Sequence, residues 1–153
     1  MKPFDMAAFS PAGTGTIADA FGTRHIIRIT ADQTGGSLGV FDVEVPPGEG
    51  PPPHVHEAEE EFFRVLSGRF AFWCNGTRVE LDEGGVIVVP RGAVHTFRNI
   101  GTTPGRFMTL VTPGGFEGLF AAVAAAQPET PENIAALSAR FHLRLVMDHS
   151  APA

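Results

Sequence analysis

Three histidines and one glutamate occur in a spacing that few folds can accommodate. His54 and His56 stand two residues apart, Glu61 follows five residues after His56, and His95 comes much later in the chain. Three imidazoles and one carboxylate are a typical ligand set for a divalent transition metal. The pattern therefore predicts one metal site. Its predicted ligands are His54, His56, Glu61 and His95.

The spacing also restricts how the chain can run through this site. On a β-strand, residues two apart face the same side, so His54 and His56 project together. Glu61 lies an odd number of residues beyond His56 and would face the opposite side of a continuous strand. Residues 57–60 must therefore bend, so that Glu61 opens a new strand. His95 belongs to a later strand, and the four ligands converge only if a sheet curls around them.

The four predicted ligands belong to two motifs, residues 48–68 and 84–99, which also have glycine, proline or asparagine at fixed positions. The motifs resemble those of the cupin superfamily, and every fixed position is filled: Gly48, His54, His56, Glu61, Gly68, Gly84, Pro90, Gly92, His95 and Asn99. The 15 residues of the segment 69–83 equal the separation usual in small single-domain cupins, including quercetinase-like proteins. The resemblance implies an all-β fold, an antiparallel jelly-roll β-barrel with the metal inside. It also implies that the four predicted ligands hold that metal.

The patterning divides the chain into three parts. Residues 24–113 are expected to form the barrel, after an N-terminal arm over residues 1–23 that includes a short strand. Residues 114–153 are expected to be helical, because apolar residues recur there at helical spacing. Thr130 and Pro131 are a typical N-cap and first-turn pair for the second helix. Both helices are expected to pack outside the barrel or near its mouth.

Two further segments predict local structure within the barrel. Asn75-Gly76 between two strand-like runs is a strong hairpin signal. Val86 to Val89 is a continuous apolar run, which is typical of a buried strand. The histidines outside the motifs are expected to be surface or packing residues rather than ligands. They are His25, His142 and His149.

Strand alternation predicts which side chains line the interior. Side chains two and four residues beyond Glu61 share its face, and Phe97 shares the face of His95. Two phenylalanines of the first C-terminal helix either border the mouth of the cavity or only cover the barrel. The pocket residues expected on this basis are Phe63, Val65, Phe97, Phe116 and Phe120. The chain has 13 phenylalanines and no tyrosine, so we expect an apolar cavity in which Glu61 or a metal-bound water transfers protons.

Four protein ligands leave coordination positions open for water, dioxygen or a chelating substrate. Together with the resemblance, this favours a metal-dependent, dioxygenase-type oxidoreductase acting on a small aromatic or enol substrate, with Glu61 as both ligand and base. One divalent metal per chain is expected, which can be iron, manganese, nickel or zinc. Two alternatives stay open: a non-catalytic cupin whose metal anchors a small molecule for binding or sensing, and a cupin isomerase or decarboxylase.

Charge and composition narrow the expected partners. The net charge is -6 and no lysine or arginine cluster occurs, which argues against nucleic acid and anionic membranes as partners. Cys74 is the single cysteine and cannot form an internal disulfide. With no apolar run long enough for a signal peptide or a membrane span, a cytoplasmic location is expected. A homodimer is also expected, because small barrels leave sheet edges to which residues 1–23 can add a strand.

Overall fold

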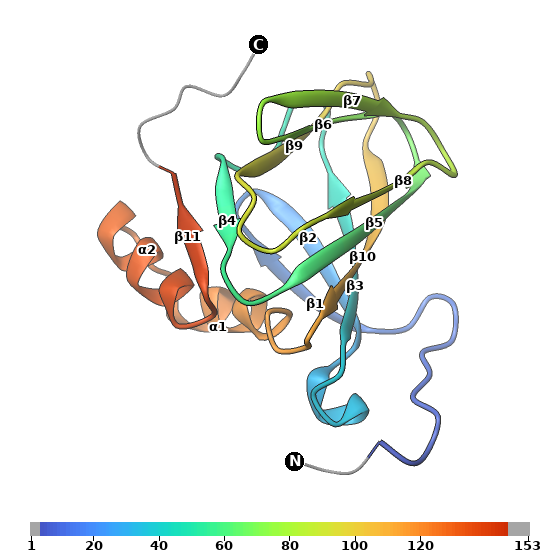
Figure 1. The fold of residues 1–153 in the computed structure, drawn as a ribbon, viewed down its shortest axis with the longest axis vertical. Helices are drawn as coiled ribbons and strands as arrows, with labels where there is room; N and C mark the ends of the chain where they lie inside the picture. The colour runs from blue at the N-terminus through green and yellow to red at the C-terminus, as the bar shows by residue number, and fades with distance from the viewer. Residues whose placement is uncertain (1–3, 147–153) are drawn as a thin grey trace.

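Two antiparallel sheets pack against each other around a phenylalanine-rich interior (Figure 1). The computed structural model describes residues 4–146. The first sheet has the strand order β1 (Thr16–Ala20), β2 (Thr23–Ile29), β3 (Gly39–Val45), β10 (Gly105–Thr112), β5 (Glu60–Ser67), β8 (Val86–Val89). The second sheet has the order β11 (Leu143–Leu145), β4 (His54–His56), β9 (His95–Asn99), β6 (Phe70–Cys74), β7 (Thr77–Leu81).

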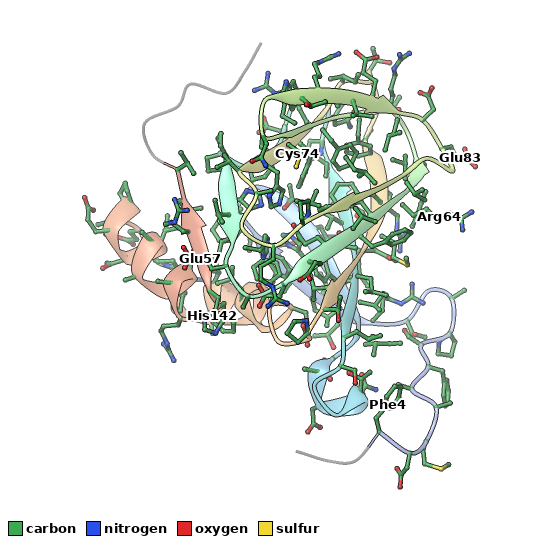
Figure 2. The ribbon with its side chains drawn as sticks, viewed as in Figure 1. Phe4, Glu57, Arg64, Cys74, Glu83 and His142 are labelled. Carbon is green, nitrogen blue, oxygen red and sulfur yellow. The ribbon has the colours of Figure 1, made fainter. Side chains whose placement is uncertain are left out.

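The mainly β, antiparallel character expected from the sequence is confirmed, but the strand pairing does not close a barrel. Within residues 4–146, no ladder of hydrogen bonds joins the two sheets, and β1, β8, β11 and β7 remain as edges. Side-chain packing connects the sheets instead. Phe63 of the first sheet lies 5.3 Å from Phe72 of the second, and Phe107 lies 4.8 Å from Phe97, between ring centroids. Alternation along β5 directs Phe63 inward, whereas Arg64 points away from the core (Figure 2).

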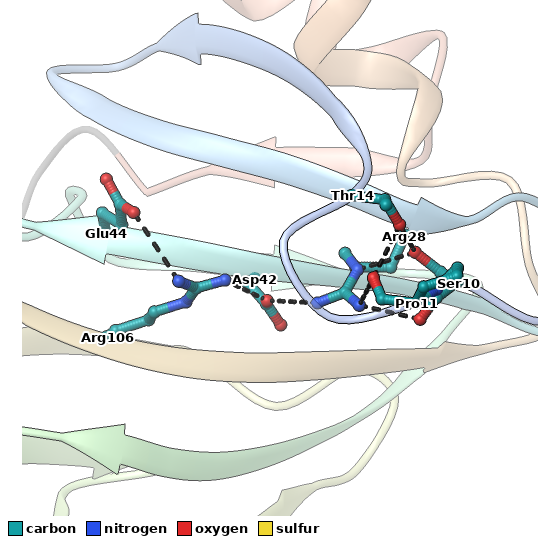
Figure 3. Close-up of polar contacts among 7 residues, drawn as sticks. All are labelled: Ser10, Pro11, Thr14, Arg28, Asp42, Glu44 and Arg106. Atoms are coloured by element: carbon teal, nitrogen blue, oxygen red, sulfur yellow. Dashed lines mark hydrogen bonds and ion pairs between the residues drawn. The ribbon is translucent and has the colours of Figure 1, made fainter.

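The N-terminal region is tied to the first sheet. Its strand β1 pairs with β2 of the same chain. The Arg28 guanidinium donates to the backbone carbonyls of Ser10 and Pro11, which precede β1, both at 2.9 Å (Figure 3). The same guanidinium donates to Asp42, a buried carboxylate that also accepts from Arg106. The contacts of Arg28 with Ser10, Pro11 and Asp42 therefore hold residues 10–14 against β2 and β3.

One local prediction within the sheets holds and another is wrong. The hairpin at Asn75-Gly76 is confirmed, since these residues join β6 to β7 with φ of 48° and 81°. Val86 to Val89 is a strand but is buried on one face only, because β8 is an edge strand whose outer face is open. The exposed fractions of Val86 and Val88 are 53% and 62%.

The C-terminal segment contains the two expected helices and one strand that was not predicted. The helices are α1 (Gly118–Ala126) and α2 (Pro131–Ala139), and the side chain of Thr130 caps α2 as expected. After α2 the chain forms β11, which pairs with β4 so that Leu143 faces His56 and Leu145 faces His54. Figure 1 shows β11 beside β4, with both helices at the same end of the sheets. None of the helices in the described part of the chain is long and apolar enough to cross a membrane.

The fully buried amide of Asn99 connects the end of β3 with the loop between β9 and β10. Its Nδ2 donates to the carbonyls of Val45 and Thr103, and its Oδ1 accepts from the Gly101 amide, all at 2.9 Å. We expect Asn99→Ala to lower the free energy of unfolding by about 2–4 kcal/mol, because several buried polar groups lose their partner. Urea denaturation measures this. Asn133→Ala, at an exposed position of α2, is the control and should change stability by less than about 0.5 kcal/mol. Equal effects of the two substitutions would contradict the structural role of Asn99.

Candidate metal centre

The four predicted ligands meet between the two sheets. β4 supplies His54 and His56, β5 supplies Glu61, and β9 supplies His95, which pairs directly with His54. One ligating atom from each residue can be chosen so that all four lie within 4.8 Å of one another. All four side chains are buried, with exposed fractions of 3–8%. The structure therefore brings the predicted set together in one dry cluster.

Backbone contacts hold the strands that carry the ligands. The Gly92 amide donates to the carbonyl of His56 at 2.9 Å and has φ of 83°, a conformation that glycine adopts without strain. The turn that leads into β9 is thereby fixed to the ligand strand β4. On the other side of β4, the Glu57 amide donates to the carbonyl of His142 at 2.9 Å, just before β11. The predicted bend between His56 and Glu61 is thus anchored at its start.

Hydrogen bonds also set the orientation of two imidazoles. Nδ1 of His54 lies 2.9 Å from the Pro52 carbonyl, and Nδ1 of His95 lies 3.0 Å from the Ala93 carbonyl. A carbonyl can only accept, so Nδ1 must carry the proton in both rings. In the neutral imidazole Nε2 then has the free lone pair. This is the tautomer that binds a metal through Nε2.

Glu61 is the electrostatic centre of the cluster. Its Oε2 lies 2.7 Å from Nε2 of His95 and 3.3 Å from Nε2 of His56. Burial by itself raises the pKa of Glu61, but the surrounding histidines outweigh burial and lower this pKa to about 2. Burial, with the neighbouring His95 and His56, lowers the pKa of His54 to about 3. Glu61 is therefore ionised and His54 neutral at neutral pH, as metal ligation requires.

These donors fit a divalent metal ion. Three imidazole nitrogens and one carboxylate oxygen converge, and two of the imidazoles have their second nitrogen held by a carbonyl. The short contact between Glu61 and His95 holds a proton that an ion would displace, since metal binding to histidine releases protons. The arrangement can therefore bind a cation in place of that proton.

Glu59 belongs to the site and was not predicted. Its exposed fraction is 4%, its Oε2 has no hydrogen-bond partner, and this oxygen lies 3.5 Å from Nδ1 of His56. It is placed to hold the one ligand imidazole that lacks a carbonyl partner. The neighbouring Glu60 points outward and pairs with Arg91. Glu59, Glu60 and Glu61 are consecutive, and nothing in the sequence indicates that Glu59 is buried beside Glu61 while Glu60 is not.

A cavity of about 440 Å³ adjoins the cluster. Four of the five predicted pocket residues line it: Phe63, Phe97, Phe116 and Phe120. Phe116 and Phe120 therefore border the cavity, and they also pack in the core. The ring of Phe116 stands edge-on to His56, with 4.2 Å between centroids. The prediction that Val65 lines the pocket is wrong. Val65 faces inward but lies farther along β5, where it packs in the core and its amide donates a hydrogen bond to the Gly85 carbonyl.

The wall of this cavity is more polar than the sequence indicated. Besides the ligands it contains Thr23, His25 and Thr109. His25 packs as expected, with its ring stacked on Phe120 at 3.6 Å, but it also lines the cavity. The sequence did not indicate that β2 lies beside the cavity. His142 is exposed between α2 and β11 (Figure 2), and His149 lies outside the described residues.

We expect Glu59→Gln to weaken Zn²⁺ binding about 10- to 100-fold, because His56 loses the carboxylate that lies beside its Nδ1 and orients its ring. Competition with a chromophoric chelator measures the dissociation constant. Glu60→Gln is the matched control and should bind Zn²⁺ like the wild type. If Glu59→Gln and Glu60→Gln bind Zn²⁺ equally well, Glu59 has no role in holding the metal.

Residues 41–111 match the cupin domain family. Among curated proteins, the chain is 33% identical over 96 residues to a quercetin 2,3-dioxygenase of Bacillus subtilis, covering 63% of this chain and 28% of that protein. It is 32% identical over 69 residues to an oxalate-binding protein of Thermotoga maritima, covering 45% of this chain and 57% of that protein. The similarity therefore covers only part of each relative's length.

Solved structures agree on the fold. A predicted oxalate decarboxylase from Thermotoga maritima superposes with a TM-score of 0.61 and 23% identity, over 71% of this chain and 99% of the other. KdgF from Halomonas sp. superposes with a TM-score of 0.65 and 19% identity, over 74% and 99%. With the two filled motifs and the converging ligands, these similarities lead to one conclusion. Residues 41–111 of the chain form a cupin domain.

Proposed function

We propose that this cupin is a metal-dependent, dioxygenase-type oxidoreductase that acts on a small aromatic or enol substrate. The observation that carries the proposal is the position of a complete histidine–glutamate ligand set against a cavity with phenylalanine walls. The partial similarity to a quercetin 2,3-dioxygenase supports the same class of substrate. A jelly-roll barrel remains the architecture that the family resemblance implies for this site.

His54, His56, Glu61 and His95 would hold one divalent ion per chain, which can be iron, manganese, nickel or zinc. When bound, such an ion supplies Lewis-acid chemistry, and iron, manganese and nickel also supply redox chemistry. Three neutral imidazoles and one carboxylate leave net positive charge on a divalent ion. That charge favours anionic oxygen groups such as enolates, which matches the proposed substrate.

The residues around the ligands would orient the substrate and take its proton. Glu61 is the one carboxylate that lines the cavity within the described residues. It is therefore the group that removes the proton from an enol or phenol hydroxyl. Phe116 lies beside the ligand His56, and Phe120 contacts Phe116. Both rings give an aromatic substrate a packing surface and exclude water from the reacting end.

The non-catalytic alternative has one observation in its favour. A relative is named an oxalate-binding protein, so the same ligands in this chain can serve to anchor a small molecule. Oxalate itself is small and doubly charged, however, and the cavity of about 440 Å³ with its aromatic lining is larger and less polar than such an ion needs. A cupin isomerase or decarboxylase would use the same ligands without consuming dioxygen. Oxygen uptake therefore separates the leading proposal from both alternatives.

We expect Glu61→Gln to keep an oxygen ligand but lose the base. Turnover of an enol or phenol substrate should fall about 10²- to 10⁴-fold, while metal content falls only modestly. Oxygen uptake across a panel of enols and phenols, with elemental analysis of each protein, measures both. Glu60→Gln is the control and should retain wild-type turnover. Unchanged turnover in Glu61→Gln would exclude the base role. No oxygen uptake with any compound would favour the binding protein or the isomerase or decarboxylase.

We also propose that the chain forms a homodimer. Val88, Phe62, Leu110 and Val40 are successive register partners across β8, β5, β10 and β3, and they form an apolar row on the outer face of the first sheet. The row ends at the edge strand β8, where Val88 is 62% exposed. A second copy of the same row would cover this surface, because a two-fold axis brings identical patches together.

Light scattering at micromolar concentration should give twice the chain mass. Val88→Lys should shift the mass toward the monomer, because it places a charge in the apolar contact. Val79→Lys, at a 37% exposed position of β7, should stay dimeric. A monomeric wild type contradicts the proposal.

A further inference from the structure

The cavity has a second polar region on a strand that carries no metal ligand. Apart from the metal cluster, the polar side chains among its described lining residues are Thr23, His25 and Thr109. Thr23 and His25 lie side by side on β2, both facing inward. The remaining lining is aromatic, aliphatic, proline or glycine. Packing alone does not explain why an imidazole lies in a wall that is otherwise mainly apolar.

His25 is held firmly in position and is uncharged. Its ring stacks on Phe120 with 3.6 Å between centroids and an interplanar angle of 10°. The exposed fraction of His25 is 5%. Burial lowers the pKa of His25 to about 4, so the imidazole is neutral at neutral pH. It is therefore suited to hydrogen bonding with a neutral oxygen group rather than to pairing with an anion.

The hydrogen-bonding capacity of His25 is poorly used within the protein. Thr23 Oγ1 donates to the Ala20 carbonyl at 3.1 Å, so its proton is committed. Nε2 of His25 lies 3.4 Å from the same Oγ1 and can only donate to it, over a long distance. Nδ1 of His25 is buried and has no hydrogen-bond partner. A buried polar group with such weak partners gains from a ligand oxygen.

An aromatic wall connects this region to the metal cluster. Phe120, which stacks on His25, contacts Phe116 at 5.3 Å between centroids, and Phe116 contacts the ligand His56 at 4.2 Å. Because His25 and the metal ligands line the same cavity, a molecule that fills it can reach the ligands at one end and His25 at the other. The cavity of about 440 Å³ is within the range of about 300–1,000 Å³ typical of small-molecule sites. It has room for a two- or three-ring compound.

We infer that His25, supported by Thr23, recognises an oxygen substituent at the far end of an aromatic substrate whose chelating oxygens lie at the metal. Nε2–H of His25, which within the protein reaches only Thr23 Oγ1 at 3.4 Å, donates instead to that hydroxyl or carbonyl oxygen. The inference rests on the proposed function and makes its substrate class more specific: an aromatic enol with a second, distal oxygen group. His25 is a specificity residue in this account and takes no part in the chemical step.

The test compares flavonols that share one chelating head. 3-Hydroxyflavone carries the hydroxy–keto head alone, whereas 3,4′-dihydroxyflavone and 3,7-dihydroxyflavone add one distal hydroxyl at either end. Binding to the Zn²⁺-loaded protein is measured by absorbance titration. We expect at least one dihydroxy compound to bind about tenfold more tightly than 3-hydroxyflavone, as one added hydrogen bond allows. His25→Phe keeps the stacking on Phe120 and should abolish this preference while changing 3-hydroxyflavone binding less than about twofold.

Two further variants make the result specific. His25→Gln can still donate a hydrogen bond and should retain part of the preference. Thr109→Val removes a polar group of the wall that has no part in the proposed contact, and it should leave the preference intact. Melting temperatures check that each variant folds. The inference is overturned if His25→Phe weakens all three compounds equally or keeps the preference. It is also overturned if Thr109→Val abolishes the preference. Failure of all three flavonols to bind the wild type would instead contradict the aromatic substrate class itself, and the inference with it.

Discussion

A buried carboxylate surrounded by imidazoles is the interaction on which this structure depends. Removing an ionised carboxylate from water costs several kcal/mol unless opposite charge or hydrogen bonds replace the lost solvation. Glu61 has that compensation because Nε2 of His95 and of His56 lie within 3.3 Å of its Oε2. The same four side chains can exchange a shared proton for a metal ion. The donor atoms of all four side chains lie within 4.8 Å of one another, so one ion can be bound among them.

The rest of the fold keeps these strands in place. The Gly92 amide fixes the turn before β9 to the carbonyl of His56, and β11 covers the other edge of β4. The two sheets themselves are joined by phenylalanine packing rather than by a ladder, so the interior retains both a core and a cavity. Phe116 belongs to both, since it is buried and also stands beside His56. Packing and substrate recognition thus share the same side chains.

The sequence predicted the features that depend on short, fixed spacing. The two-residue step from His54 to His56, the Asn75-Gly76 turn and the Thr130 cap are determined by nearby residues, and each forms as expected. Features set by distant contacts were missed. β11 has three residues and no periodicity of its own, so only its pairing with β4 makes it a strand. Exposure of β8 and the position of His25 in the cavity wall depend on which strands become neighbours, and local pattern carries no such information.

The most direct test of the central claim is the position of a bound metal. Crystals of the protein loaded with Zn²⁺ would be measured on both sides of the zinc absorption edge, so that the anomalous difference map locates the ion. The account predicts one peak per chain, about 2.0–2.2 Å from an imidazole nitrogen of His54, His56 and His95 and from a carboxylate oxygen of Glu61. No peak at this cluster in zinc-loaded crystals, or a single peak beside the exposed His142, would contradict it.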